Sequence, residues 1–168
     1  MLAVNVSPRQ FRKEDFAGQI QALVRRHQIN PSRLKLELTE GALLENVEDT
    51  IETMNALNVI GVRLSLDDFG TGYSSLQYLK RLPLHQLKID KSFVHDIGAD
   101  PSDKAIVQTI IAMAQSLNLD VIAEGVETDE QRRLLLDRGC RYFHGYFFGR
   151  SIPADDFESL LNQLQSRD

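Results

Sequence analysis

The stretch Val62-Arg63-Leu64-Ser65-Leu66-Asp67-Asp68-Phe69-Gly70-Thr71-Gly72 decides how the whole chain is interpreted. Apolar and polar residues alternate as far as Leu66, which is typical of a β-strand with one buried face. The pattern ends at two adjacent carboxylates, and the glycines that follow favour a tight turn. Adjacent carboxylates repel each other and resist burial, so this pair favours a bound cation. An Asp-rich turn that caps the next helix is the alternative, and the stretch alone does not separate the two.

Strand-like and helix-like segments alternate on both sides of this stretch. Strand patterns cover residues 2–6, 34–40, 62–67, 84–90, 120–124 and 140–146. Helical patterns cover residues 16–29, 46–57, 74–80, 101–117, 128–136 and 154–164. Strands separated by helices predict a parallel sheet, either doubly wound or closed into a barrel. No linker or internal repeat interrupts the pattern, so we interpret residues 1–168 as one domain.

In the second, third and fourth predicted strands, apolar and polar residues occupy alternate positions, so that each strand has one apolar face and one polar face. The apolar residues are Leu34, Leu36, Leu38, Val62, Leu64, Leu66, Leu87 and Ile89. The polar residues are Lys35, Glu37, Arg63, Asp67, Gln86 and Lys88. A doubly wound sheet has helices on both faces and is apolar on both. The asymmetry therefore favours an α/β fold of the TIM-barrel-like (β/α) type, with an interior that is polar toward one end.

Polar residues near the C-terminal ends of five strands form one candidate constellation. Its members are Asn5, Glu37, Asp67, Asp68, Lys88 and Glu124. Active sites of β/α barrels form at this end of the strands. A salt bridge or a solvated strand end is the alternative for any one of these residues, but five consecutive strands with the same feature favour a shared site.

The candidate ligands are oxygens, without a His or Cys cluster, which indicates Mg²⁺ or Mn²⁺ and not zinc. Two adjacent aspartates with further carboxylates suit a pair of ions acting on a phosphate. Lys88 would then neutralise charge on the phosphate or orient a water molecule, and Glu124 would accept a proton.

Composition restricts the class of protein further. With 42% hydrophobic residues, 26% charged residues and a net charge of -5, the chain is typical of a globular domain. The acidic balance and scattered basic residues exclude a surface that wraps a nucleic acid polymer, whereas a small nucleotide bound through metal ions is compatible. The single cysteine, Cys140, excludes a disulfide framework and fits a reducing cytoplasm. No signal peptide or apolar run of membrane-spanning length is present, so we expect a cytoplasmic chain.

Five strings, in this order, are similar to the motifs of the EAL-domain cyclic di-GMP phosphodiesterases. They are Asn5-Val6-Ser7, Glu37-Leu38-Thr39-Glu40, Asp67-Asp68-Phe69-Gly70-Thr71-Gly72, Leu87-Lys88-Ile89-Asp90 and Glu124-Gly125-Val126-Glu127. The resemblance runs nearly end to end. It implies a modified TIM barrel that hydrolyses cyclic di-GMP to linear pGpG by two-metal catalysis with Mg²⁺ or Mn²⁺.

The resemblance also implies roles for individual residues. The metal ligands of the family match Asn5, Glu37, Asp67 and Asp68. Lys88 and Glu124 match residues engaged with metal or with the nucleophilic water. Glu40 matches the glutamate that holds the Asp-Asp-Phe-Gly-Thr-Gly loop in its working shape, and Glu127 matches a further carboxylate of the site. Family members couple dimerisation to activity through that loop.

Two features depart from the family pattern. The Glu-Ala-Leu motif of the first strand, whose glutamate is a metal ligand, has no counterpart here, and about six strands are present where a complete barrel has eight. We therefore expect an N-terminally truncated EAL domain, its C-terminal two-thirds, with weak or no activity. The second departure is His144, at a position where the family usually has glutamine. A histidine that hydrogen-bonds near the site, one that becomes charged and weakens metal binding, and a plain strand-end histidine all fit.

The open barrel also predicts partners. Unpaired edges at residues 2–6 and 140–146 tend to pair, so we expect a homodimer or edge-mediated self-association. A GGDEF (diguanylate cyclase) domain or a sensory domain in the parent protein would be a further partner. The alternatives to a phosphodiesterase are a catalytically silent EAL module that binds cyclic di-GMP or a signalling partner, and an unrelated metal-dependent barrel. The register of the motifs and the retention of Asp67, Lys88 and Glu124 favour the enzyme.

Overall fold

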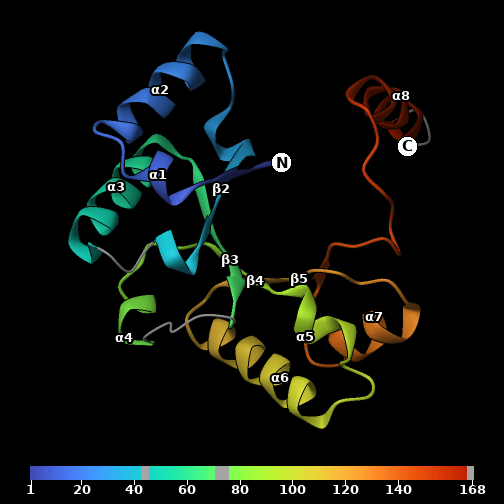
Figure 1. The fold of residues 1–168 in the computed structure, drawn as a ribbon. Helices are drawn as coiled ribbons and strands as arrows, with labels where there is room; N and C mark the ends of the chain where they lie inside the picture. Colours follow the sequence, from blue (N-terminus) through green and yellow to red (C-terminus); the bar gives the residue numbers. More distant parts are fainter. Residues whose placement is uncertain (43–45, 71–75, 166–168) are drawn as a thin grey trace.

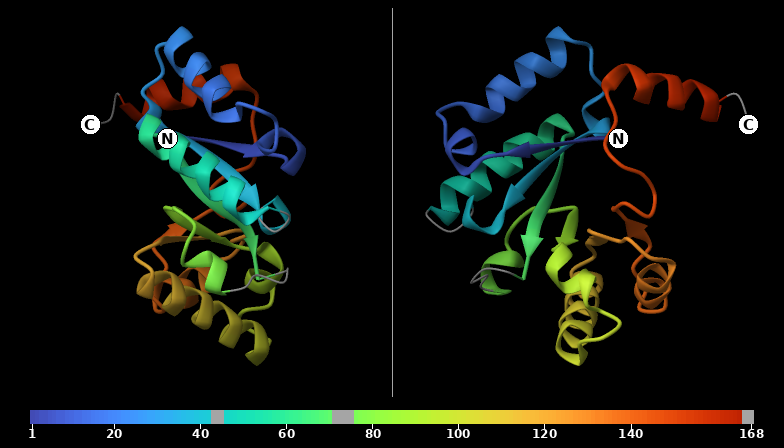
Figure 2. Two further views of the ribbon diagram at one scale, coloured as in Figure 1. Left: turned by 90° about the vertical axis from the view of Figure 1, so that its left-hand side faces the viewer. Right: turned by 45° about the vertical axis from the view of Figure 1, so that its right-hand side comes forward.

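The computed structural model describes residues 1–42, 46–70 and 76–165 (Figure 1). Its centre is one sheet of parallel strands, each paired with the next along the chain. The strands are β1 (Leu2–Val6), β2 (Leu34–Thr39), β3 (Arg63–Phe69), β4 (Gln86–Ile89), β5 (Asp120–Ala123) and β6 (Tyr142–Phe143). This unbroken order is that of a barrel, because a doubly wound sheet reverses its order at a switch point. The six predicted strands are confirmed, and the sheet curls into a half-barrel with β1 and β6 as its edges (Figure 2).

Helices connect the strands and cover the outer face of the sheet, except for the last helix of the chain, which lies apart from the sheet (Figure 2). They are α1 (Pro8–Phe11), α2 (Phe16–Arg26), α3 (Val47–Ile60), α4 (Leu76–Leu79), α5 (Lys91–His95), α6 (Pro101–Ser116), α7 (Asp129–Leu136) and α8 (Ala154–Gln165), with 3₁₀ turns η1 (Pro31–Arg33) and η2 (Glu40–Ala42). Capping by side chains explains where several of these helices begin. Ser7 and Thr128 each close a capping box with the glutamine three residues later, and the Asp100 side chain accepts a hydrogen bond at the start of α6. None of the helices in the described ranges is long and apolar enough to cross a membrane.

The strand parity predicted from the sequence is confirmed. Six outward residues of β2, β3 and β4 are almost completely buried under the helices: Leu36, Leu38, Leu64, Leu66, Leu87 and Ile89. Burial of each such side chain contributes about 1.5–3 kcal/mol. The inward residues are polar and pair across the half-barrel: Lys35 Nζ donates to Gln86 Oε1 at 2.6 Å, and Arg63 lies 3.3 Å from Asp120. The apolar face thus packs the core, while the polar face lines the inside of the curl.

Several segments differ from the sequence prediction: the fourth strand is Gln86–Ile89 instead of residues 84–90, and the short helices α1 and α5 were not predicted. The sixth strand is limited to Tyr142–Phe143 instead of residues 140–146, because Cys140 precedes the pairing and Gly145 leaves the sheet to lie against the backbone of Val126. The helix predicted over residues 74–80 is observed as α4 (Leu76–Leu79), and residues 74 and 75 of that prediction lie outside the described residues.

Helix α8 lies apart from the sheet on the side where the half-barrel is open (Figure 2). Its apolar residues Phe157, Leu160 and Leu161 are exposed, as are Leu2 and Val4 on the edge strand β1. The open side of the half-barrel therefore presents apolar groups that nothing in the described ranges covers.

Candidate active site

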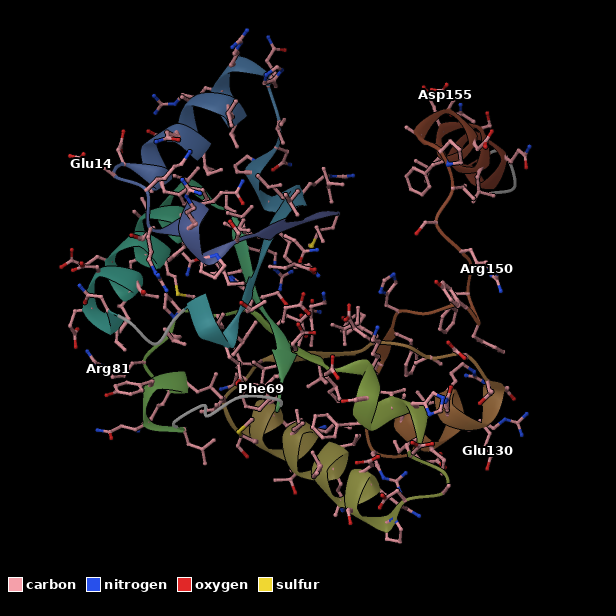
Figure 3. All side chains as sticks on the ribbon, viewed as in Figure 1. Glu14, Phe69, Arg81, Glu130, Arg150 and Asp155 are labelled. Carbon is pink, nitrogen blue, oxygen red and sulfur yellow. The ribbon has the colours of Figure 1, made fainter. Side chains whose placement is uncertain are left out.

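The carboxyl ends of the strands bring three carboxylates together around one ammonium group. Lys88 of β4 places Nζ 2.6 Å from Glu37 Oε2 of β2, 2.9 Å from Asp67 Oδ1 of β3 and 2.8 Å from Glu124 Oε1, directly after β5. Phe69, labelled in Figure 3, marks the end of β3. Four residues that the sequence predicted for one site therefore lie in direct contact.

This cluster is largely withdrawn from water. Glu37, Asp67 and Lys88 are each less than 10% exposed. Burial alone would lower the pKa of Lys88, but its hydrogen bonds to Glu124, Glu37 and Asp67 outweigh that effect and raise the pKa well above the ordinary value. The lysine is therefore a permanent cation at the centre of the acidic groups.

Asp68 reaches the same site through an irregularity in the sheet. Successive residues of a regular strand point to opposite faces. The pairing of β3 with β4 shifts between Leu66 and Phe69, and Asp68 has a left-handed backbone with φ 54. As in a β-bulge, this shift re-aims a side chain. Oxygens of Asp67, Asp68 and Glu124 consequently lie within 4.8 Å of one another.

The Asp67, Asp68 and Glu124 group suits a hard divalent cation. All three offer carboxylate oxygens, the donors that Mg²⁺, Mn²⁺ and Ca²⁺ prefer. Burial, the charge of Asp67 and the nearby carboxylates of Asp90 and Glu124 raise the pKa of Asp68. The part of this pKa rise that comes from neighbouring negative charge is one that a bound cation would relieve.

Glu40 holds the far end of β3. It is buried in η2, and its Oε1 accepts a hydrogen bond from the backbone N–H of Gly70 at 3.1 Å. Gly70 has φ +102, a backbone conformation that favours glycine. The contact ties Glu40 to the residue that follows β3, and the next residues of that loop, 71–75, lie outside the described ranges. The loop-holding role of Glu40 stays a prediction.

A pocket of about 650 Å³ opens beside Glu124. Its lining includes the two other predicted site residues, Glu127 and His144. His144 Nδ1 lies 3.4 Å from Glu124 Oε1, with the imidazole largely exposed. The guanidinium of Arg150 lies 5.1 Å from the centre of the Tyr146 ring on the same wall. The pocket has the size of a small-molecule site.

Asn5 lies at the margin of the site. It pairs in register with Glu37 on the neighbouring strand, so both belong to the same layer of the half-barrel. Its side chain is exposed, because β1 is an edge strand.

Sequence reasoning missed Asp90, whose carboxylate stands next to Asp68. Burial would raise the pKa of Asp90, but hydrogen bonds from Ser92 outweigh it and lower the pKa. The Asp-x-Ser spacing before α5 is a helix-capping signal that would have located this residue.

Comparison with known proteins agrees with this geometry. The family model of the EAL domain matches residues 1–151. The signaling protein YkoW of Bacillus subtilis is 43% identical over 99% of the chain, and the cyclic di-GMP phosphodiesterase NbdA of Pseudomonas aeruginosa is 44% identical over 95%. The chain spans about a fifth of the length of these relatives, 21% of YkoW and 20% of NbdA.

Solved structures show the same fold. The chain superposes on the c-di-GMP complex of the PaMucR phosphodiesterase with TM-score 0.88, 42% identity, 92% of this chain and 63% of that one. The EAL domain of Mycobacterium smegmatis DcpA gives TM-score 0.92, 37% identity, 97% of this chain and 73% of that one. The manganese and cyclic di-GMP complex of Klebsiella pneumoniae BlrP1 gives TM-score 0.82, 32% identity, 89% of this chain and 38% of that one. Sequence motifs, half-barrel and strand-end carboxylates lead to one conclusion: the chain belongs to the EAL domain family.

Proposed function

We propose that this domain hydrolyses cyclic di-GMP to linear pGpG with the help of Mg²⁺ or Mn²⁺. The observation that carries the proposal is the meeting of Glu37, Asp67, Asp68 and Glu124 with Lys88 at the strand ends. The names of NbdA and of the PaMucR complex support the same substrate, and the manganese complex of BlrP1 supports the metal.

The proposed metal ligands are Asn5, Glu37, Asp67 and Asp68. Glu124, proposed here as the proton acceptor, lies close enough to Asp67 and Asp68 to share a cation with them. When bound, divalent cations supply electrostatic stabilisation of a phosphoryl oxygen and lower the pKa of a coordinated water.

The side chains of the domain do the remaining work. The Lys88 ammonium donates hydrogen bonds toward a phosphate oxygen or the attacking water, and Glu124 Oε1 accepts the proton which that water loses. Glu40 keeps the end of β3 in place through Gly70. Glu127 and His144 border the pocket that receives the nucleotide.

The decisive test incubates the chain with cyclic di-GMP in Mn²⁺, Mg²⁺ or EDTA. Chromatography of the reaction mixture then measures how much linear pGpG has formed. We expect pGpG only with metal, and Asp67→Asn should lower the rate at least about 100-fold. Asp120→Asn is the matched control, because Asp120 pairs with Arg63 at the opposite end of the strands. Full activity of Asp67→Asn would remove the metal assignment.

The chain contains no Glu-Ala-Leu sequence, so we expect a rate well below that of an EAL domain with the full ligand set. Binding of cyclic di-GMP in calorimetry without any turnover would favour the second candidate, a silent binding module. Turnover of another phosphodiester, with neither binding nor hydrolysis of cyclic di-GMP, would favour a different metal-dependent hydrolase.

Partners and compartment are proposals as well. We propose self-association through the open side of the half-barrel, where β1 and α8 expose apolar groups. A diguanylate cyclase or sensory domain in the parent protein is proposed because MucR of Pseudomonas aeruginosa is named a bifunctional diguanylate cyclase and phosphodiesterase. The cytoplasm is the proposed compartment, since a buried free thiol such as that of Cys140 fits a reducing environment.

A further inference from the structure

Lys88 occupies the position where a cation is most strongly required. Its Nζ lies within 2.9 Å of three carboxylates from three different strand ends. Counted over the side chain alone, Lys88 is 6% exposed, and its partners Glu37, Asp67 and Glu124 are 8%, 12% and 19% exposed. Hydrogen bonds in which both partners are charged are the strongest that side chains make, and they are stronger when the groups are buried away from water.

The carboxylates that hold Lys88 are also the candidate ligands of the metal. Asp67 and Glu124 belong to the group whose oxygens lie within 4.8 Å of one another, together with Asp68. An ammonium bonded to Asp67 Oδ1 and Glu124 Oε1 uses oxygens that a divalent cation between the same groups would need. The lysine and the metal therefore share ligands.

Other basic side chains near the cluster do not take the same place. Lys35 Nζ is 3.6 Å from Glu37 Oε1 and makes its short contact, 2.6 Å, with Gln86. His144 approaches Glu124 at 3.4 Å from the exposed side of the pocket. Among the described residues, Lys88 is the cation that bridges several carboxylates of the cluster.

We propose that Lys88 is a built-in counter-ion which holds the carboxylates together when no divalent cation is bound, and which releases Asp67 and Glu124 when one binds. Lys88 is then a positioning residue for the metal site, in addition to any role toward phosphate or water. This inference rests on the metal assignment of the proposed function.

The proposal predicts antagonism between the lysine and the metal. Without the ammonium, the metal-free protein must hold Glu37, Asp67 and Glu124 together without the cation that bridges them, which destabilises the fold. A divalent cation would no longer compete for Asp67 and Glu124, so it would bind more tightly. If Lys88 contacted only substrate or water, its removal would leave the stability of the metal-free protein and its affinity for the divalent cation unchanged.

The experiment compares the full-length chain with Lys88→Met and Lys35→Met. Thermal unfolding is followed in EDTA and in rising Mn²⁺, and free Mn²⁺ is measured by electron paramagnetic resonance. In EDTA we expect Lys88→Met to melt roughly 10 °C below the unsubstituted chain. Its Mn²⁺ dissociation constant should be at least about tenfold lower, which corresponds to a difference of ~1.4 kcal/mol in binding free energy.

Lys35→Met is the matched control, because it removes another inward lysine of low exposure, one that contacts a single carboxylate. We expect it to lower the melting temperature while leaving Mn²⁺ affinity within about twofold, far from the roughly tenfold change above. If Lys88→Met does not fold in EDTA, the double variant Asp67→Asn/Lys88→Met should recover folding, because it also removes one negative charge. A double variant that stays unfolded in EDTA would contradict a counter-ion role.

The outcomes separate this inference from the proposed function. If Lys88→Met binds Mn²⁺ with equal or weaker affinity, the competition between Lys88 and the metal for Asp67 and Glu124 is overturned, but the metal assignment is not. An unchanged melting temperature in EDTA overturns the counter-ion role. If neither the unsubstituted chain nor either variant binds Mn²⁺, the metal assignment is overturned, and so is the competition between Lys88 and the metal.

Discussion

At the scale of single residues, a polar side chain near the start of β4 is linked to the backbone of the neighbouring strand. His85 stands just before β4, and its Nδ1 accepts a hydrogen bond from the backbone N–H of Leu64 at 3.2 Å. Burial and the positive charge of Arg63 lower the pKa of His85, while Asp120 opposes them. The folded protein therefore favours the neutral imidazole, which alone can accept this hydrogen bond.

This arrangement predicts a pH dependence of stability. Because the folded pKa lies below the ordinary value of 6.5, the unfolded chain takes up the proton first as the pH falls. The contribution of His85 is complete above about pH 6.5 and is lost as the pH falls toward the folded pKa. In His85→Gln, whose amide oxygen accepts the same bond without titrating, the drop in melting temperature between about pH 7.5 and pH 5.5 should be smaller by about 2–4 °C.

His95→Gln is the control for this measurement, because His95 is exposed on α5 and pairs with its neighbour Asp96. Its melting temperature should follow pH as that of the unsubstituted chain does. An identical pH dependence in His85→Gln and in the unsubstituted chain would contradict the role assigned to His85.

At the scale of elements, the turn after β6 sets one wall of the site. A Cβ on Gly145 would lie 2.2 Å from the carbonyl oxygen of Val126 and 2.4 Å from its nitrogen. The backbone N–H of Val126 donates to His144 at 3.0 Å, and that of Phe147 donates to Val126 at the same distance. The residues after β5 and after β6 are thus tied together where only a glycine fits.

Gly145→Ala should consequently separate these two segments. Overpacking against the backbone costs about 1–3 kcal/mol of unfolding free energy, and it should displace His144 from Glu124. We expect a lower midpoint in urea and weaker cyclic di-GMP binding by calorimetry. Gly149→Ala is the matched control, because a Cβ there meets nothing within 4 Å. Equal midpoints for the two variants would show that the contact with Val126 is not limiting.

The bulge in β3 shows what element patterns do and do not predict. Alternation along β2, β3 and β4 correctly predicted that Glu37, Asp67 and Lys88 share the inner face. The same alternation would point Asp68 outward, and the shift of pairing between Leu66 and Phe69 alters that direction. Such a shift depends on how β3 meets β4, which a pattern within one strand does not contain.

At the scale of the whole molecule, the half-barrel is open between β1 and α8. Phe157, Leu160 and Leu161 follow the spacing of one helical face, and all are exposed. The labels of Arg150 and Asp155 in Figure 3 show the connecting segment and the start of α8 away from the sheet. A helix of this length gains little stability without tertiary packing.

The proposed occupant of this open side is a second copy of the chain. The mass measured by light scattering should rise with concentration, and replacing both Leu160 and Leu161 by lysine should raise the dimer dissociation constant at least about tenfold. Val59→Lys is the control, since Val59 is an exposed apolar residue of α3. A concentration-independent monomer, or an unchanged constant in the double lysine variant, would contradict self-association through α8.

The sequence by itself determined the parallel strand order, the polar inner parity and the oxygen donors that meet at the strand ends. Those properties are local, because a period of two residues assigns each side chain to a face and parallel strands end at one rim. Only the tertiary structure decided that Asp68 turns inward, that Lys88 sits among Glu37, Asp67 and Glu124, and that β6 is short. The reason is physical: these features arise from close approach between residues far apart in the chain, where charge, backbone contact and pairing register act together.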